Sequence, residues 1–434
     1  MVRIGIREED SYTWERRVPL IPADVASLRS HGIDVVVERS AKRAYTDQEY
    51  TDAAVPVVED LSDCPIIVGL KEVPAERVAA DTLYVFFSHT IKGQPCNMPM
   101  LARLMEQRCT LVDYERIVDA DGRRLIFFGN YAGLAGMIDS LWALGQRLAV
   151  EAIDSPFLAV ERALHYPDLD AAKDAIRAVG DAIRRDGLPS AIAPLVVGVA
   201  GYGNVSHGVQ EILQLLPVRA LDPSDLLHGR AASLLDRHTV GMVVFREEHT
   251  VAPRAAGAPF DLERFFREPT AYRSAFDRYL PHLDVLMNCV YWSPGAPRLV
   301  TKAWARDVGA ARRLRVIGDI SCDVEGAVEL TVKATEPDNP VYVYDAVRDR
   351  AIDGVDGDGP VVLAVEILPS ELPREASAYF SEILKRYIPS IAGASLDEPL
   401  ETSGLPEELV RATIVHRGRL TPAYRHLEAY LPGE

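Results

Sequence analysis

Short apolar runs alternate with helix-like segments through the first third of the chain, and this alternation is the strongest constraint on the fold. VRIGI, IDVVVE, PIIVGLK, TLYVFFSHT and CTLVDYE each contain an apolar stretch with the length of a buried strand. Helix-like segments such as VASLRSHG and MLARLMEQR lie between them. Strands that alternate with helices form parallel sheets that are covered on both faces. The pattern therefore predicts an α/β domain.

A second run of the same kind begins near residue 195. LVVGVAGYGNVSHGVQEILQLL combines an apolar strand, a glycine turn and an amphipathic helix, and VRAL, TVGMVVF, DVLMNCVYW and RVIGDIS follow as strands. A long helix is predicted over 132–153, leading from one domain to the other. The 434 residues exceed what one hydrophobic core usually holds, so two domains are expected.

Charge and cysteine spacing exclude several classes of protein. The net charge of −17 repels phosphate backbones and anionic lipid surfaces, so neither a nucleic-acid partner nor a membrane partner is expected. No apolar run approaches a membrane span, and MVRIGIREEDSYTWERR lacks a signal-peptide core, which favours a cytoplasmic protein. Neither a disulfide framework nor a metal site is predicted from the five cysteines, which are Cys64, Cys96, Cys109, Cys289 and Cys322.

The glycine turn of the second domain predicts a dinucleotide site. Gly201, Gly203 and Gly208 follow a strand and open a helix, where backbone amides can bind a pyrophosphate. Asp222 stands about 20 residues further on, at the position of an acid that binds the adenosine ribose. The alternative is that the glycines only permit strand–helix packing and that Asp222 only begins a turn.

Ionisable residues stand where the strands of the first domain end. Lys71 and Glu72 follow IIVGL, His89 follows YVFFS with Lys92 soon after, and Glu115 follows LVDY. Ligands of open α/β sheets bind beyond the carboxyl ends of strands, so these groups are expected to converge on one site. Each of them is alternatively a surface charge or a hydrogen-bonded structural residue. Carboxylate binding suits the forked guanidinium groups of Arg16, Arg17, Arg123 and Arg124, although arginine pairs are equally common on solvated surfaces.

Longer motifs resemble one enzyme family over residues 5–430. ERRVPLIP, VGLKE, YVFFSHTIKGQ, LVDYERIVDADGRRL, GYGNVSHGVQEI, GDISCDVEGAVE and LPSELPREAS look like the lysine-ketoglutarate reductase half of the bifunctional lysine-degrading enzyme of animals and plants. The chain is similar, more distantly, to fungal saccharopine dehydrogenase and to alanine dehydrogenase with its transhydrogenase relatives. The saccharopine-cleaving half has no counterpart in the sequence, so the chain resembles a free-standing reductase.

This resemblance implies two Rossmann-like domains with parallel sheets and a cleft between them. Residues 1–130 and 327–434 would form a discontinuous substrate domain, and residues 131–326 the dinucleotide-binding domain. Lys71 and His89 match the acid–base pair of the family, and Arg17 and Arg124 match its carboxylate binders. The remaining matches are the charged neighbours Glu72, Lys92 and Glu115, the acid Asp319 near the nicotinamide, and the nucleotide-loop residues Gly201, Gly203, Asn204, Val205 and Gly208.

The implied activity is the reversible condensation of L-lysine with 2-oxoglutarate and reduction of the imine to saccharopine. Asp222 favours NAD by the general rule, whereas the resembling reductases are associated with NADPH, and NADPH is expected. Two alternatives remain, an NAD(P)-dependent dehydrogenase for another amino acid and a non-catalytic dinucleotide-binding subunit. No metal is expected. Neither the amine donor nor the oligomeric state can be read from the sequence.

Overall fold

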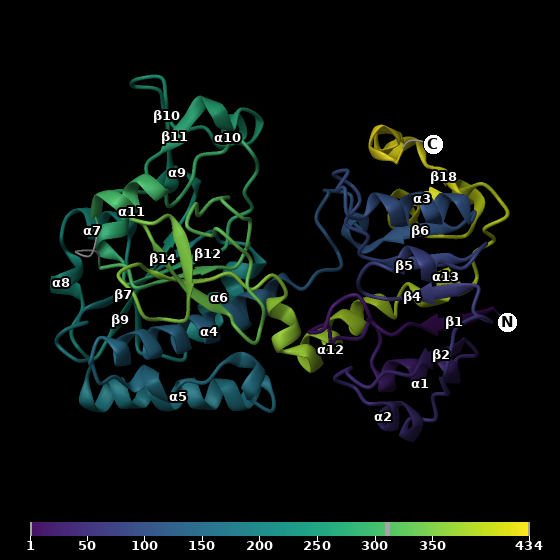
Figure 1. Ribbon diagram of the computed structural model, residues 1–434, viewed down its shortest axis with the longest axis horizontal. Coiled ribbons are helices and arrows are strands. Elements are labelled where there is room, and N and C mark those ends of the chain that lie inside the picture. Colours follow the sequence, from purple (N-terminus) through teal and green to yellow (C-terminus); the bar gives the residue numbers. More distant parts are fainter. Residues whose placement is uncertain (1, 309–312, 433–434) are drawn as a thin grey trace. The chain divides into compact units, whose positions relative to one another are not determined.

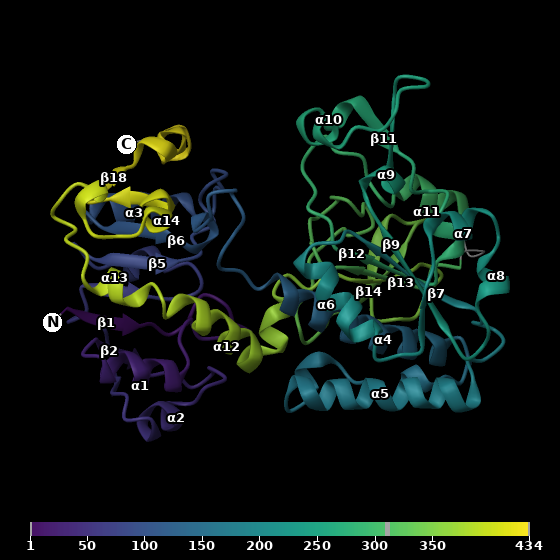
Figure 2. The ribbon, with the colours of Figure 1, turned by 180° about the vertical axis from the view of Figure 1, so that it is seen from behind.

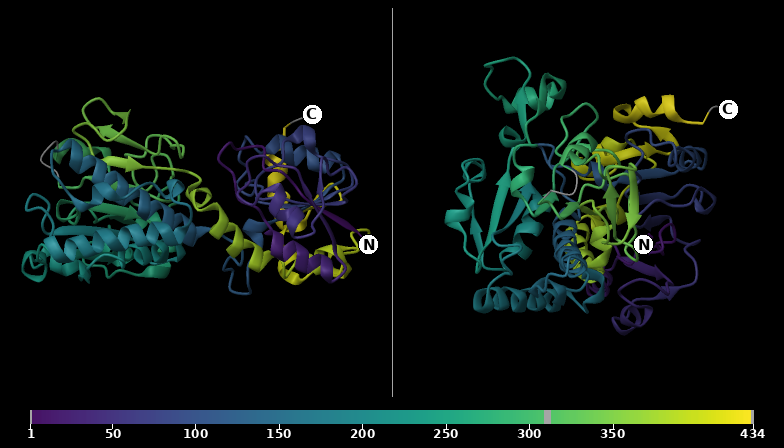
Figure 3. Two further views of the ribbon diagram at one scale, coloured as in Figure 1. Left: turned by 90° about the horizontal axis from the view of Figure 1, so that it is seen from below. Right: turned by 60° about the vertical axis from the view of Figure 1, so that its left-hand side comes forward.

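The computed structural model describes residues 2–308 and 313–432 and divides the chain into two compact units. The first unit runs from the N-terminus through Phe128 and resumes at Pro373, and the second is Gly129–Leu372. Both labelled ends of the chain belong to the first unit (Figures 1 and 3). Residue 1 and residues 433–434, the extremes of the expected first domain, lie outside the described residues.

An eight-stranded sheet forms the centre of the first unit, in the order β18-β17-β6-β5-β4-β1-β2-β3. Its six strands from the N-terminal segment are parallel, whereas β17 runs antiparallel to β6 and to β18. The strands are β1 Arg3–Ile6, β2 Asp34–Glu38, β3 Val57–Val58, β4 Ile66–Val68, β5 Leu83–Phe86, β6 Thr110–Asp113, β17 Thr413–His416 and β18 Arg419–Leu420.

Helices from both ends of the chain cover this sheet. They are α1 Pro22–Ser30, α2 Asp47–Asp52, α3 Met98–Glu106, α12 Pro373–Leu384, α13 Ile388–Ala392 and α14 Glu407–Ala412. Figure 2 shows α12 and α13 in front of the strands, and Phe380, Leu384 and Ile388 from these helices join the core of the sheet. The returning C-terminal segment is therefore an integral layer of the first unit.

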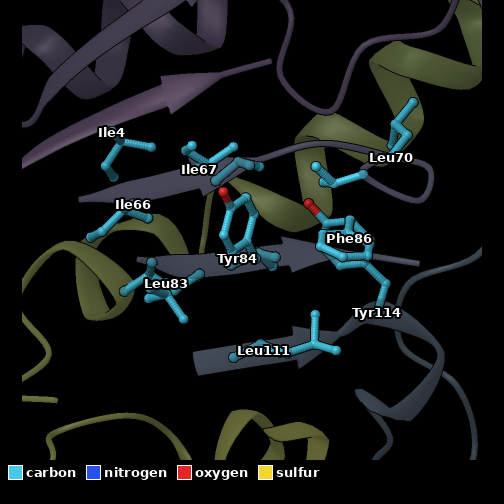
Figure 4. Close-up of a cluster of buried hydrophobic side chains, with 14 of the residues drawn as sticks. Ile4, Ile66, Ile67, Leu70, Leu83, Tyr84, Phe86, Leu111 and Tyr114 are labelled. Carbon is cyan, nitrogen blue, oxygen red and sulfur yellow. The ribbon is translucent and has the colours of Figure 1, made fainter. Parts of the chain in front are cut away.

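The core of the first unit consists of apolar side chains on both faces of its sheet. Ile4, Ile66 and Leu83 are in register on neighbouring strands, and Tyr84 is in register with Leu111 on the next strand (Figure 4). Because both faces are covered, the strands are apolar throughout, with Leu83–Phe86 buried at every position. Because the strands themselves are buried, the polar residues that follow their carboxyl ends are the groups that a ligand can reach.

A second mixed sheet of eight strands organises the other unit, in the order β15-β14-β16-β13-β12-β7-β9-β8. All neighbouring pairs are parallel except those of β14, which runs antiparallel to β15 and β16. The strands are β7 Leu195–Ala200, β8 Val218–Ala220, β9 Val240–Phe245, β12 Val285–Asn288, β13 Val316–Asp319, β14 Val341–Asp345, β15 Arg350–Asp353 and β16 Val361–Leu363. A separate two-stranded ribbon is formed by β10 Val251–Pro253 and β11 Tyr272–Ser274.

The long predicted helix is α4 Gly129–Val150, which opens the second unit. It packs closely on α6 Asn204–Leu213, the helix that follows the glycine turn. The other helices of this unit are α5 Leu169–Asp186, α7 Pro223–Leu227, α8 Ala231–Leu234, α9 Glu247–Thr250, α10 Leu262–Arg267 and α11 Lys302–Val308.

The predicted α/β class is confirmed, but the expected domain boundary at residue 327 is wrong. Strands β14, β15 and β16 lie beyond that residue, yet β16 pairs with β13 and extends the second sheet. The chain returns to the first unit only at Pro373. Residues 327–372 therefore belong to the second unit, because the strands in this segment pair with the sheet of that unit.

Candidate active site

Lys71 lies just beyond the end of β4, where an acid from the segment after the neighbouring strand β1 fixes the backbone. The N–H groups of Leu70 and Lys71 donate to the Glu9 carboxylate, at 2.6 and 2.9 Å. The ammonium group of Lys71 lies 4.9 Å from the centre of the Tyr12 ring. Burial and the nearby Glu15 raise the pKa of Glu9, despite the opposing charge of Arg7. The main chain of Lys71 is thus anchored while its amine reaches an aromatic face.

His89 lies beyond the end of β5, the parallel neighbour of β4, and contacts Glu72. Its Nδ1 is 2.5 Å from Glu72 Oε1. Burial alone would raise the pKa of Glu72, but the hydrogen bond and charge of His89 outweigh it and lower that pKa. A carboxylate can only accept, so the hydrogen-bond pattern assigns the proton to Nδ1. Nε2 is then the nitrogen suited to exchange a proton with a substrate.

Arg17 is buried against an acid rather than open to solvent. Its guanidinium donates to both carboxylate oxygens of Glu15, at 2.8 and 2.5 Å, and lies 4.1 Å from the centre of the Phe128 ring. Burial raises the pKa of Glu15, but Arg17 foremost, and Lys71 with it, lower that pKa overall. The fork that the sequence assigns to a substrate carboxylate is thus engaged by Glu15 in this structure.

Two further residues of the predicted site, Glu115 and Arg124, pair with each other. Glu115 follows β6, and its carboxylate accepts from the half-exposed guanidinium of Arg124. Lys92 lies exposed in the loop after His89. The structure thus joins Glu72 to His89 and Arg124 to Glu115, as separate contacts at the same edge of the sheet.

A pocket of about 340 Å³ lies beside Glu72. Tyr12, Glu72 and Asn97 contribute to its wall, together with the exposed Cys96. One carboxylate oxygen of Glu72, Oε2, is buried and accepts no hydrogen bond from the described residues. The pocket therefore brings an acid and a phenol, next to Lys71 and His89, within reach of a small polar molecule.

The glycine turn of the second unit has the backbone that a pyrophosphate requires. Gly201 adopts a left-handed conformation, with φ of +104°, directly after β7. Gly203 has open space where a side chain would stand, and Asn204 and Val205 form the first turn of α6. A Cβ on Gly208 would collide with the carbonyl oxygen of Asn130 in α4. Gly201 thus permits the tight left-handed turn, Gly203 leaves room at the positive end of the helix, and Gly208 permits helix packing.

The two acids predicted near the cofactor have different surroundings. Asp222 is exposed at the end of β8 and caps α7 by accepting from the N–H of Ser224 at 2.8 Å. Asp319 ends β13 and is buried, accepting from Asn288 at 2.8 Å and from Thr331 at 2.5 Å. Burial raises the pKa of Asp319. Asp222 is therefore accessible to a ribose, whereas Asp319 organises the strand ends around it.

Four residues that hold the backbone or side chains of these groups in the first unit were not predicted from the sequence: Glu9, Glu15, Asn97 and Asp113. A signal existed for Glu9, which follows VRIGI as Glu72 follows IIVGL, and for Asp113, the last residue of its strand. Glu15 and Asn97 became recognisable only through their contacts with Arg17, Glu72 and His89.

The described residues contain neither a metal-binding cluster nor a membrane-spanning helix. In residues 2–308 and 313–432, no cluster of three or more His, Cys, Asp and Glu side chains could hold a metal ion. None of the helices in the described part of the chain combines the length and apolarity needed to cross a bilayer.

Comparison with known proteins relates the chain to alpha-aminoadipic semialdehyde synthase, to saccharopine dehydrogenase and to the alanine dehydrogenase family. Residues 5–135 match the family described as alanine dehydrogenase/PNT, N-terminal domain. The chain is 37% identical over 442 residues to alpha-aminoadipic semialdehyde synthase of Arabidopsis thaliana, covering 98% of this chain but 41% of the relative. Saccharopine dehydrogenase (NAD(+), L-lysine-forming) of Neurospora crassa is 31% identical over 397 residues, covering 88% of this chain and 89% of the relative. The chain thus spans less than half of the Arabidopsis relative but nearly all of the fungal one.

Solved structures agree on the fold. An L-alanine dehydrogenase superposes with a TM-score of 0.63 at 19% identity, covering 99% of this chain and all of that one. A transhydrogenase from Sinorhizobium meliloti gives a TM-score of 0.53 at 16% identity, covering 97% of this chain and all of that one. The two sheets and their helices therefore have the alanine dehydrogenase fold.

Proposed function

The chain belongs to the family of L-lysine-forming saccharopine dehydrogenases, and from this premise we propose that it condenses L-lysine with 2-oxoglutarate and reduces the imine to saccharopine. The reaction is reversible. The observation that carries the proposal is the pair of proton-transfer groups, Lys71 and His89, at the ends of the neighbouring strands β4 and β5. A dinucleotide-binding subunit without catalysis does not require such a pair.

The chemistry needs proton transfer at two atoms. The side-chain amine of lysine must lose a proton before it attacks the keto carbon, and the carbinolamine hydroxyl must gain one before it leaves as water. We assign the first task to Nε2 of His89, because Glu72 holds Nδ1. Lys71 is assigned the second task, because its ammonium group can donate and is flanked by the aromatic face of Tyr12.

Substrate carboxylates have to be bound against a net charge of −17. Arg124, half exposed beside Glu115, is proposed to bind one of them directly. Arg17 is proposed to bind another by exchanging one of its two bonds to Glu15 for the substrate. Lys92 adds positive charge in the exposed loop after His89.

The glycine turn fits a nicotinamide dinucleotide, which supplies the hydride when bound. Amides at the start of α6 would hold the pyrophosphate, and Asp222 would meet the adenosine ribose. We propose NADPH as the preferred form, because Arg230 lies beside this position and donates to the Ser224 hydroxyl at 3.0 Å. A guanidinium there suits a 2′-phosphate and offsets the charge of Asp222.

A turnover assay tests the function. Oxidation of NADPH and of NADH is followed with L-lysine plus 2-oxoglutarate, and product saccharopine is identified by mass. Ammonia plus pyruvate and ornithine plus 2-oxoglutarate serve as matched substrate controls. We expect turnover with L-lysine plus 2-oxoglutarate to exceed turnover with either control pair, and saccharopine to be the product. The KM of NADPH should be lower than the KM of NADH. Equal or greater turnover with either control would assign the chain to another amine, and a strong preference for NADH would overturn the cofactor proposal.

A further inference from the structure

The backbone of His89 is held in an unusual conformation. Its φ is +46°, in the left-handed region that residues other than glycine seldom adopt unless the surroundings impose it. The residues on both sides, Ser88 and Thr90, are fully buried, and their hydroxyl oxygens are 2.7 Å apart. The ring of His89 lies nearly parallel to that of Phe87, at 13°. A strained residue between two buried neighbours requires contacts that keep it there.

Asp113 makes those contacts on one side of His89. This buried acid ends β6, directly opposite Phe86 of β5. One carboxylate oxygen accepts from the N–H of Ser88 at 3.2 Å and also from the Ser88 hydroxyl. The other accepts from the N–H of Glu115 at 2.7 Å. Asp113 thus ties the residue before His89 to the end of the neighbouring strand.

Asn97 makes the contacts on the other side. Its side-chain amide donates to the carbonyl oxygen of His89 at 3.1 Å and more weakly to Glu72 Oε1 at 3.4 Å. Both partners can only accept, which fixes which end of the amide faces them. The same Glu72 oxygen accepts from His89 Nδ1. Asn97 therefore links the backbone of His89 to the carboxylate that orients its ring.

We propose that Asp113 and Asn97 are positioning residues that hold His89 in its left-handed conformation, so that Nδ1 stays on Glu72 and Nε2 is presented to the substrate. The use of Nε2 rests on the proposed function, whereas the conformation and the ring tautomer do not. A structural role for the same residues would stabilise the loop without affecting which ring nitrogen carries the proton. The two roles therefore predict different tautomers of the His89 ring when Asp113 or Asn97 is replaced.

Three variants of the full chain provide the test. Asp113→Asn keeps the size of the side chain but turns an amide N–H₂ toward a donor, and Asn97→Ala removes both bonds of Asn97. Asp168→Asn is the matched control, because Asp168 also accepts from a backbone N–H, that of Ala171 at 2.8 Å, but caps α5 in the second unit. Ring ¹⁵N chemical shifts report the tautomer of His89, and the spectrum of His89→Gln identifies its signals.

We expect the wild type to carry the proton on Nδ1 of His89. In Asp113→Asn and Asn97→Ala the two tautomers should become mixed, and kcat should fall roughly 10- to 100-fold while the KM of the cofactor stays the same. Asp168→Asn should match the wild type in both readouts. The milder variant Ser88→Ala, which loses only the hydroxyl bond, replaces Asp113→Asn if that protein does not fold.

Unchanged ¹⁵N shifts in both variants would overturn the positioning role, whether or not kcat falls. A wild type that carries the Nδ1 proton but does not turn over lysine and 2-oxoglutarate would refute the proposed function alone. In that case the shifts of the variants still decide whether Asp113 and Asn97 hold His89.

Discussion

Acidic neighbours distinguish the two proton-transfer residues. Lys71 is anchored through its backbone by Glu9, and its amine lies over the ring of Tyr12. His89 is held through its ring by Glu72, which leaves one nitrogen for chemistry. An ammonium group at the end of a long side chain suits proton delivery to the carbinolamine hydroxyl. A fixed imidazole suits proton removal from an amine that must approach in one direction.

We predict that Lys71→Met and His89→Gln each lower kcat by about 10²- to 10⁴-fold, the usual cost of removing a general acid or base. The KM of the cofactor should stay nearly unchanged, and each variant should lose one limb of the pH–rate profile. Controls are Lys173→Met, which removes an ion pair with Glu211 in the second unit, and His31→Gln at the exposed end of α1. Near-normal turnover with an unchanged pH profile would show that the substituted residue takes no part in proton transfer.

The two arginines should respond differently to replacement by lysine. Arg17→Lys and Arg124→Lys keep the charge but lose the two-pronged hydrogen bonding, so the Michaelis constant for lysine or for the keto acid should rise. Arg17→Lys should also lower the melting temperature, because Arg17 is buried on Glu15, whereas Arg124→Lys should not. Steady-state kinetics and thermal unfolding measure both effects, with Arg103→Lys on the surface of α3 as control. Wild-type kinetics in both variants would contradict a role in carboxylate binding.

At the scale of elements, the glycines between β7 and α6 have two separate roles, one in binding the ligand and one in packing α6 on α4. Gly201 supplies a left-handed backbone and Gly203 an open approach, both at the start of α6. Gly208, one turn later, permits α6 to pack on α4 without a side chain between them. The same residue type therefore serves the ligand at one end of the motif and the core at the other.

Gly203→Val should raise the KM of the dinucleotide at least about tenfold, which is about 1.4 kcal/mol of binding free energy. The KM of lysine should change little. The side chain has open space in the folded protein, so the melting temperature should stay close to that of the wild type. Gly208→Val is the informative comparison, because it should lower the melting temperature instead. Equal increases in both Michaelis constants for Gly203→Val would contradict a pyrophosphate site at this turn.

At the scale of the whole molecule, two acids make stability depend on pH in opposite directions. Arg374 foremost lowers the pKa of Glu49 to about 2, so the stability from this acid is lost as the pH falls toward that value. Glu371 behaves oppositely. It is buried beside Asp139 of α4, and burial, followed by the Asp139 charge, raises its pKa well above 4.5. The folded state then binds a proton that the unfolded state releases, so stability falls as the pH rises through that interval.

Glu371→Gln should therefore flatten the fall in stability above pH 4.5. The amide cannot ionise, so the slope of up to about 1.4 kcal/mol per pH unit that one bound proton contributes should disappear. At pH 8 the melting temperature should exceed that of the wild type, by about 2–4 °C for each kcal/mol gained. Thermal unfolding from pH 4.5 to 8 is the measurement, with the exposed Glu263→Gln as control. Parallel curves for the variant and the wild type would show that Glu371 is ionised in the fold.

Local patterns in the sequence determined the α/β class, five of the eight strands in each sheet and the glycine turn, because strand length, side-chain burial and turn conformation depend on neighbouring residues. Lys71, Glu72 and His89 could be named as candidates, since the ends of parallel strands meet at one edge of a sheet. The place of a residue after a strand does not show which side chain it pairs with. The bond of Arg17 to Glu15 and that of Arg124 to Glu115 depend on side-chain directions set by packing.

Only the tertiary structure decided where the second unit ends and what surrounds His89. Strands β14–β16 belong to the second sheet because β16 hydrogen-bonds to β13, a pairing that apolar runs alone cannot assign to one sheet or the other. Asp113 and Asn97 reach the backbone on either side of His89 from separate parts of the chain. Sequence periodicity reports which residues share a face. Contacts between distant segments exist only once hydrophobic burial has brought those faces together.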